Sequence, residues 1–342
     1  MIRILLSFLL FSLFINSYAF RFADDKDGSL LPIDICKIYG NGNYCSFTSL
    51  AKYRNKYYCA FREGMSHVGD GDYGVIKILT SDDGNCWKLD EVIKGSLIDF
   101  RDPYLSVTPD GRLLILCGAR IKNEAGFYIT KSYYATKKGK RFSTFKPIKL
   151  PPEVDDVYCA WCWRVTWYKK IGYTIEYRYD GNKQRVELLK TADGENYDRI
   201  TTLNVPGNPS EGKIVMVGKN EMIAVIRTNE NGYMGRSFFP YTEWEWKELP
   251  FFVGGHDLAF FNNTFIVASR RHKSNGISDT CIYYGSMYDW YSRSITLPSG
   301  GDTGYCGILE VDDEIWFSYY SSHENERPSI YLAKIPYCFF EK

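Results

Sequence analysis

The sequence carries almost no net charge, and this absence removes whole classes of partner. Lysine and arginine number 42 and aspartate and glutamate 41, so electrostatics gives no reason to expect nucleic acid or an anionic membrane as the main partner. Beyond the amino terminus no stretch is apolar enough to span a bilayer, so we expect no membrane span. The cysteines lack the paired spacing of a zinc site, because the Cys159-x-x-Cys162 pair stands alone; we expect no metal.

The amino terminus has the pattern of a secretory signal peptide. Arg3 is followed by an apolar run, and Ser17 and Ala19 are the small residues of a cleavage site. We therefore expect residues 1–19 to be removed by cleavage near Ala19 and residues 20–342 to form a single domain. The protein would then be secreted, to the cell exterior or the periplasm, where disulfides can form.

A phrase of two apolar strands joined by a short turn recurs along the chain. Its six copies end at Arg62, Arg120, Arg178, Arg227, Arg270 and Tyr319. The intervals between these ends run from 43 residues (270 − 227) to 58 residues (120 − 62). Periods near this length are typical of β-propellers, because one blade cannot bury both of its faces until neighbours stack against it. The sequence therefore predicts an all-β fold, a six-bladed β-propeller of four-stranded antiparallel blades.

Closure of the ring should involve both ends of the domain. An open propeller would leave an unpaired edge strand, so we expect the segment near Cys36 to pair with the last strand near Cys338. A disulfide between these two cysteines would lock that closure in an exported protein.

A second repeat, Ser/Thr-x-x-Gly-x-x-aromatic, marks turns at the far ends of the blades. Its copies begin at Ser81, Thr136 and Thr191. The first copy, as Thr80-x-Asp82-x-Gly84-x-x-Trp87, resembles the Asp-box of sialidases and related propellers. In such a turn the acidic side chain bonds backbone N–H groups, glycine takes a positive φ and the aromatic ring fills the space between sheets. We expect a structural and not a catalytic role for it.

The propeller topology would bring polar residues from separate repeats to one mouth of the central channel, where first strands start and second strands end. The starts of first strands hold Arg101, Asp102, Arg164, Glu211, His256, Asp257, Asp302 and Tyr305. The ends of second strands hold Arg62, Arg120, Tyr177, Arg178, Arg227 and Arg270, and the loop after Arg62 adds His67, Asp70 and Asp72. Convergent charged groups predict a site. For any single residue, an ion pair between blades is an equal alternative.

At these positions the chain resembles the sialidase (neuraminidase) superfamily of six-bladed propellers. The segment Asn208-Pro209-Ser210-Glu211-Gly212, with Arg227 after it, resembles the segment of the family's glutamate and second arginine. The segment Gly301-Asp302-Thr303-Gly304-Tyr305 resembles that of the tyrosine nucleophile. The loop from His67 to Asp72 lies where the family has its aspartate acid/base.

One part of the family pattern is missing. The entry to the first blade reads Tyr44-Cys45-Ser46-Phe47-Thr48 and lacks the arginine that the family has there. Arg62, on the neighbouring strand, is the cation that could replace it.

The resemblance implies a retaining glycoside hydrolase that cleaves a terminal, acidic sugar from a glycan without a metal or an organic cofactor. Tyr305 would be the nucleophile, Glu211 its base, and Asp72, with Asp70 as the alternative, the acid/base. The arginines Arg227, Arg270 and Arg62 would hold the carboxylate of the substrate. Further substrate contacts are expected from Arg101, Asp102, Arg164, His256, Asp257 and Asp302.

Three other interpretations fit the same sequence. A sialidase-like propeller that has lost its acid would be a secreted lectin. Phe100-Arg101-Asp102-Pro103 also resembles the Arg-Asp-Pro phrase of five-bladed furanosidases, in which the aspartate stabilises the transition state. A structural or protein-binding propeller would have its mouth filled by side chains. The discriminating geometry is whether Tyr305, Glu211 and an aspartate surround one cavity.

Overall fold

The structure is a computed structural model that describes residues 20–25, 30–137, 139–151, 158–273, 276–286, 289 and 293–341. Nearly all regular structure within these residues is β-strand, so the predicted all-β class is confirmed. The predicted signal peptide, residues 1–19, lies outside the described residues. Among the described residues, no helix has the length and apolar character needed to cross a membrane.

The strands form two sheets of four strands and two of nine. The first four-stranded sheet contains β3 (Tyr44–Tyr53), β4 (Lys56–Gly64), β5 (Val75–Ser81) and β6 (Lys88–Ile93). The second contains β16 (Gly212–Val217), β17 (Glu221–Ile226), β18 (Tyr233–Phe238) and β19 (Glu245–Glu248). Both are antiparallel throughout.

The two larger sheets contain the remaining strands. One contains β7 (Ile98–Val107), β8 (Leu113–Lys122), β9 (Tyr128–Lys137), β10 (Lys146–Pro147), β11 (Cys159–Cys162), β12 (Thr166–Tyr168), β13 (Ile171–Tyr179), β14 (Gln184–Thr191) and β15 (Tyr197–Leu203). The other contains β20 (Asp257–Phe261), β21 (Thr264–His272), β22 (Ser278–Gly285), β23 (Arg293–Leu297), β1 (Phe20–Asp25), β2 (Leu30–Tyr39), β26 (Ser329–Pro336), β25 (Glu314–Ser321) and β24 (Thr303–Val311). A short 3₁₀ helix, η2 (Tyr337–Phe339), follows β26.

The strands near the centre are apolar on both faces. In β8 the seven residues from Leu113 to Ala119 are all buried, and in β17 the five from Met222 to Ile226 are. An antiparallel sheet with one face in water would alternate buried and exposed residues. The sheets are therefore covered on both faces by their neighbours, and hydrophobic clusters fill the spaces between them.

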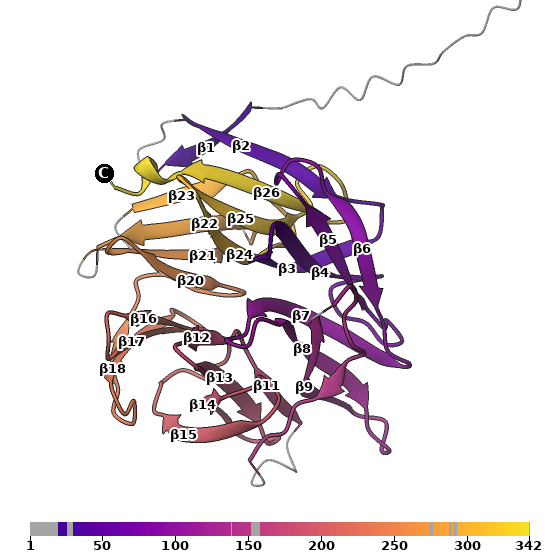
Figure 1. Ribbon diagram of the computed structural model, residues 1–342, viewed down its shortest axis with the longest axis vertical. Helices are drawn as coiled ribbons and strands as arrows, with labels where there is room; N and C mark the ends of the chain where they lie inside the picture. The colour runs from indigo at the N-terminus through magenta and orange to yellow at the C-terminus, as the bar shows by residue number, and fades with distance from the viewer. Residues whose placement is uncertain are drawn as a thin grey trace, which may run out of the picture.

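The ring closes where the two ends of the domain meet. Figure 1 shows the sheets following one another in chain order around a common centre, with β2 beside β26. Cys36 in β2 is paired with Leu332 in β26, so the predicted closure near Cys36 is confirmed. The predicted disulfide is wrong, because Cys36 and Cys338 are both free thiols. Backbone pairing closes the ring, and Cys338 lies beyond the paired strand, as the exposed residue of helix η2.

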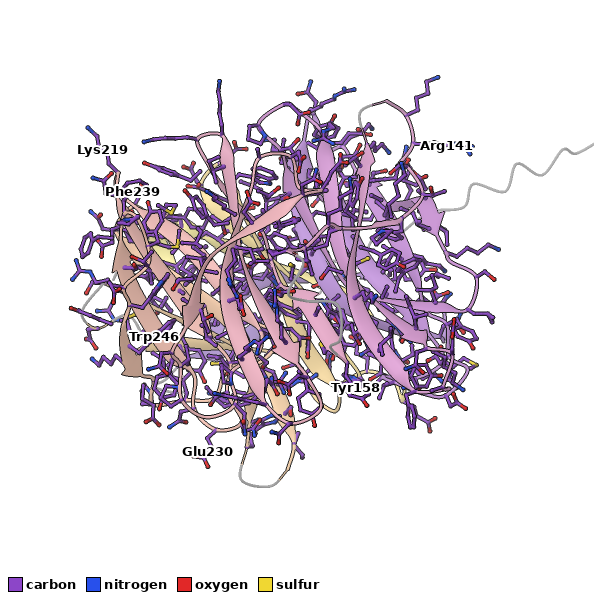
Figure 2. The ribbon with its side chains drawn as sticks, turned by 90° about the horizontal axis from the view of Figure 1, so that it is seen from below. Arg141, Tyr158, Lys219, Glu230, Phe239 and Trp246 are labelled. Carbon is purple, nitrogen blue, oxygen red and sulfur yellow. The ribbon has the colours of Figure 1, made fainter. Side chains whose placement is uncertain are left out.

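Two opposite faces of the molecule carry the two kinds of loop. Tyr158, just before β11, and Glu230, just after β17, lie on one face in Figure 2. Lys219, in the β16–β17 turn, and Phe239, just after β18, lie on the opposite face. Starts of inner strands and ends of the next strands therefore share one face, as the topology predicted. We call this face the mouth.

The turn that resembles an Asp-box uses a different aspartate from the predicted one. The Asp83 carboxylate accepts hydrogen bonds from the N–H groups of Asn85 (2.8 Å) and Cys86 (3.0 Å), whereas Asp82 forms an ion pair with Lys56. The Gly84 N–H donates to the Ser81 hydroxyl at 2.8 Å. A turn of the same form recurs at Thr191, with Asp193 as the acceptor.

Gly84 tests how tightly this turn packs against the next sheet. It has a φ of +74°, and a Cβ there would overlap the Trp316 ring. We expect Gly84→Ala to lower the free energy of unfolding by about 3 kcal/mol, from backbone strain plus overpacking. Gly111→Ala is the control, since Gly111 has a similar φ of +76° and no atom within 4 Å of its Cβ position. Urea denaturation should show about 1 kcal/mol for the control; equal losses would contradict tight packing at Trp316.

Candidate active site

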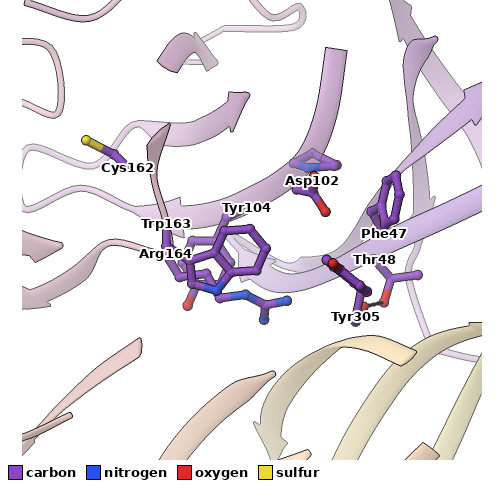
Figure 3. Close-up of a pocket in the computed structure, with 9 residues that line it drawn as sticks. Phe47, Thr48, Asp102, Tyr104, Cys162, Trp163, Arg164 and Tyr305 are labelled. Atoms are coloured by element: carbon purple, nitrogen blue, oxygen red, sulfur yellow. Dashed lines mark hydrogen bonds between the residues drawn. The ribbon is translucent and has the colours of Figure 1, made fainter. Parts of the chain in front are cut away.

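Three inner strands bulge at the mouth and direct one side chain each towards the centre. The ladders of β3, β7 and β24 shift register at Phe47, Asp102 and Tyr305, and these residues have φ values of 60°, 48° and 48°. Bulges turn a side chain away from its regular direction, and a positive φ is strained for a residue with a side chain. All three side chains line the same small cavity, as Figure 3 shows.

The cavity limits what can enter the centre of the ring. It has a volume of about 10 Å³, which is about the space that one water needs. It is lined by Phe47, Thr48, Asp102, Pro103, Tyr104, Cys162, Trp163, Arg164 and Tyr305. A sugar ring does not fit at this depth, so the ring would bind above the cavity, at the mouth, and no more than a single atom of it could enter the cavity.

Tyr305 and Glu211 form the centre of the site. The Tyr305 hydroxyl donates a hydrogen bond of 2.8 Å to Glu211 Oε1, which confirms the prediction that the two are neighbours across the mouth. Arg227 Nη1 donates to the same Oε1 at 2.8 Å and lies 3.4 Å from the Tyr305 hydroxyl. The Gly255 N–H holds the second oxygen, Oε2, at 2.6 Å. The carboxylate is therefore fixed with one oxygen on the phenol.

The surroundings of Glu211 and Tyr305 shift their pKa values in opposite directions. Burial alone would raise the pKa of the Glu211 carboxyl, but the Arg227 guanidinium and the Gly255 N–H outweigh burial and lower that pKa. Burial, together with the negative charge of Glu211, raises the pKa of the Tyr305 phenol well above its ordinary value. At neutral pH Glu211 is an ionised proton acceptor and Tyr305 holds its proton.

A second polar group lies beside the Tyr305 ring. Arg270 Nη2 donates to Asp302 Oδ1 at 2.7 Å, and Asp302 Oδ2 lies 2.8 Å from His67 Nδ1. The side chains of Arg270, Asp302 and His67 are 15%, 26% and 38% exposed, so all three can be reached from solvent. Tyr44 and Tyr320, which the sequence analysis missed as site residues, also donate to Asp302.

Arg62 is not a substrate ligand in this structure. Its side chain is fully buried and donates to Asp99 Oδ1 at 2.7 Å, to Asp72 Oδ2 at 3.1 Å and to the Ser66 carbonyl at 2.8 Å. The predicted place of Arg62 beside the other two arginines is therefore corrected: two buried carboxylates and the Ser66 carbonyl hold its side chain inside the protein. Asp99 was not singled out from the sequence, although it stands at a strand start like the polar residues that were.

The two aspartates predicted as acid/base are held in other ways. Asp72 accepts hydrogen bonds from Arg62 and from the N–H groups of Met65 and Ser66. Burial opposes ionisation of Asp72, but these backbone N–H groups and Arg62 more than offset it and lower the pKa. Asp70 is exposed and pairs with Lys122 at 2.7 Å. Neither carboxyl is poised to donate a proton at neutral pH.

The remaining predicted residues divide into two groups. Arg101 lies over the Phe47 ring at 4.8 Å and donates to the His67 carbonyl at 2.7 Å, so it stands beside the site. Arg164 and Asp257 form a buried ion pair of 2.9 Å, and the fully buried His256 contacts the Val225 carbonyl. Arg164 also lines the small cavity, whereas His256 and Asp257 are buried side chains with partners inside the protein.

Comparisons with known proteins identify the fold. No protein-family model and no curated protein matches the sequence. A protein of unknown function from Dyadobacter fermentans matches 88% of this chain and 97% of its own, with 17% identity and a TM-score of 0.76. An α-L-arabinofuranosidase from Fusarium graminearum matches 90% of this chain and 99% of its own, with 13% identity and a TM-score of 0.65.

A sialidase is also among the similar structures. The Trypanosoma rangeli sialidase in complex with sialic acid matches 90% of this chain, with 11% identity and a TM-score of 0.63. This chain spans 56% of the length of that sialidase. At such low identities the likeness shows the fold alone, and that fold is a sialidase-like propeller.

The buried contacts of Asp72 predict a structural role for it. Because its pKa is lowered in the folded state, Asp72 stabilises the fold at pH values above its ordinary pKa, and this stabilisation is lost as the pH falls through the folded pKa. Asp72→Asn should therefore lower the free energy of unfolding by about 3 kcal/mol at pH 7, since Arg62 loses a buried partner. The difference from wild type should shrink below about pH 4.

Chemical denaturation at several pH values would measure this effect. Asp70→Asn is the matched control, because Asp70 is exposed and its substitution should leave the unfolding midpoint unchanged. If Asp72→Asn has the same free energy of unfolding as the wild type at pH 7, the ion pair between Arg62 and Asp72 does not stabilise the fold.

Proposed function

We propose that the protein is a secreted, retaining glycoside hydrolase with a sialidase-like active site, in which Tyr305 is the nucleophile and Glu211 its base. The observation that carries the proposal is the hydrogen bond of 2.8 Å from the Tyr305 hydroxyl to an ionised, buried Glu211. Proton transfer requires heavy atoms within about 2.6–3.2 Å. Secretion rests on the signal-peptide pattern of residues 1–19.

The proposal includes six blades. Each nine-stranded sheet has one weak junction: β1 joins β23 through two residue pairs, and β9 joins β11 through two parallel pairs. Division at these junctions separates β7–β10 from β11–β15, and β20–β23 from the group β24–β26, β1 and β2. With the two four-stranded sheets, this supports six blades in the order of the sequence repeat.

The chemistry follows from the protonation states at the mouth. As the Tyr305 oxygen bonds to the anomeric carbon, its proton passes to Glu211 and the glycosidic C–O bond breaks, with a proton supplied to the leaving oxygen. A free phenolate is not available at neutral pH, because the pKa of Tyr305 is raised. Attack and proton transfer to Glu211 are therefore coupled, and the hydrogen bond between the two groups is the path. Water then releases the sugar in the reverse sequence.

The arginines at the mouth bear on the charge of the sugar. An acidic sugar would be held by Arg227, whose side chain is 30% exposed, and by Arg270. Each of these arginines already has a carboxylate partner, and the segment from Tyr44 to Thr48 has no arginine that would complete the set. These features favour a second candidate, a neutral furanoside, for which hydroxyl groups and not a carboxylate would bind Asp302 and His67.

Removal of the Tyr305 hydroxyl tests the mechanism. We expect Tyr305→Phe to lower kcat by about 10³-fold or more, because the nucleophile is lost. Tyr319→Phe is the control, since its hydroxyl bonds the Pro298 carbonyl and not Glu211. Hydrolysis would be measured on aryl glycosides of sialic acid, uronic acids and arabinose.

A fluorinated activated glycoside should also trap the sugar on Tyr305 of the wild type, which mass spectrometry of peptides would locate. A label on another residue would refute this nucleophile. Binding of glycans without turnover of any glycoside by the wild type would make the protein a lectin.

Arg227→Lys tests whether the substrate carries a carboxylate. A lysine cannot reproduce the planar fork of arginine, so kcat/KM for an acidic glycoside should fall about 10- to 100-fold more than for a neutral one. Arg271→Lys is the control, because Arg271 has a similar exposure of 33% but pairs with Asp279. Equal losses on both substrates would assign Arg227 to holding Glu211 alone.

A further inference from the structure

The site as described lacks a proton donor for the leaving group. A retaining glycosidase needs a second carboxyl that gives a proton and later takes it back. Asp72 is held ionised by buried donors, and Asp70 is exposed and paired with Lys122. We propose that Asp102 is the general acid/base of the site; this inference rests on the function proposed above.

The backbone brings Asp102 to the reacting groups. Asp102 occupies the bulge of β7 that corresponds to the bulge of Tyr305 in β24, and both have a φ of 48°. Both side chains line the cavity of about 10 Å³ (Figure 3). They are close enough for the charge of Asp102 to raise the pKa of Tyr305. Two strained bulges, on strands that are not neighbours in a sheet, therefore direct their side chains into the same small cavity.

One carboxyl oxygen of Asp102 has an unused capacity for hydrogen bonding. The side chain is 8% exposed, and its Oδ1 has no hydrogen-bond partner among the described residues. A buried carboxyl oxygen without a partner is costly, and native proteins keep such groups mainly at functional sites or beside water. The cavity has space for one oxygen atom, either of a substrate or of water. The nearest cation to the other oxygen, Oδ2, is Arg101 Nε at 3.9 Å, beyond hydrogen-bond distance.

The protonation of Asp102 is opposite to that of Glu211. Burial raises the pKa of Asp102 to about 7, and the negative charge of Glu211 contributes to the rise. Among the charged groups around Asp102, Arg101, Arg164 and Arg62 lower this pKa, whereas Glu211 raises it. A pair of carboxyl groups, one held ionised and one held protonated near neutral pH, is the usual arrangement of base and acid in such enzymes.

Asp302 is the other acidic candidate at the mouth, and its contacts argue against it. Its Oδ1 accepts hydrogen bonds from Arg270 and Tyr320, and its Oδ2 from Tyr44. Both oxygens therefore have donors already, whereas Asp102 Oδ1 has none. Asp302 fits a role in holding Arg270.

The proposed step balances protons and bonds. The Asp102 carboxyl gives its proton to the leaving oxygen as the glycosidic bond breaks, the Tyr305 oxygen bonds to the anomeric carbon, and Glu211 takes the phenol proton. In the second half, the Asp102 carboxylate takes a proton from the attacking water, the bond from the sugar to Tyr305 breaks, and Glu211 returns its proton to the phenolate. Asp102 and Glu211 end in their starting states.

Leaving-group dependence in the full-length enzyme tests this role. Asp102→Asn should lower kcat/KM by about 10²- to 10⁴-fold on glycosides with poor leaving groups. The loss should be under about 10-fold on nitrophenyl glycosides, which need little protonation. The alkaline limb of the pH profile of kcat/KM, near pH 7 in the wild type, should disappear. Asp72→Asn, assayed where it is folded, should show equal losses on both substrates.

A direct titration covers the case in which the variant does not fold. Carbon-13 NMR of the aspartate carboxyls in the wild type should show a group that titrates near pH 7, above Asp302, whose pKa burial raises to about 6. The higher signal should be absent from Asp102→Asn, if that variant folds, and the lower one should remain. In an active wild type, absence of such a group would overturn the role of Asp102 alone. Leaving-group dependence in Asp72→Asn instead of Asp102→Asn would do the same. Failure of the wild type to cleave any glycoside would refute the proposed function and this role with it.

Discussion

The pairing of β2 with β26 is the constraint on which the rest of the structure depends. The strands near the centre, such as β8 and β17, are buried on both faces, so their sheets would not be stable with one face in water. Stacking satisfies every face only if the first and last sheets also meet. The five residue pairs between β2 and β26 join the two ends of the domain and close the ring without a covalent bond. Closure then fixes the positions of all inner strands around one centre.

Closure of the ring brings the charged residues at the strand ends close together. Many of these residues form ion pairs with one another. Arg62 and Asp99, Arg164 and Asp257, and Arg270 and Asp302 each join two elements that are distant in the chain. A buried charge without a partner would cost several kcal/mol, so the repeated arginines first have a structural purpose. The residues left for chemistry are those with a partner and some exposure, such as Arg227, or with an unused oxygen, such as Asp102.

The site depends on local strain that the ring supports. Phe47, Asp102 and Tyr305 all adopt a positive φ, which costs free energy at each position. The surrounding strands hold these conformations because the inner strands are paired on both sides of each bulge. The result is a phenol and a carboxyl that face the same cavity although they come from β24 and β7, which are far apart in the chain. Figure 3 shows both side chains among the residues that line this cavity.

The sequence by itself determined the all-β class, the closure near Cys36 and the shared face of Tyr305 and Glu211, whereas the direct contact of these two residues was implied by the family resemblance. The repeat of two apolar strands can be recognised in the sequence, and its period determines which strand ends share a face. Only the tertiary structure decided that Arg62 and Asp72 hold each other and that Asp83, not Asp82, completes its turn. It also decided that Cys36 and Cys338 stay unpaired and that Asp102 faces Tyr305. Burial, bulges and the choice among neighbouring carboxylates depend on contacts between distant strands, and a local pattern of residues does not encode those contacts.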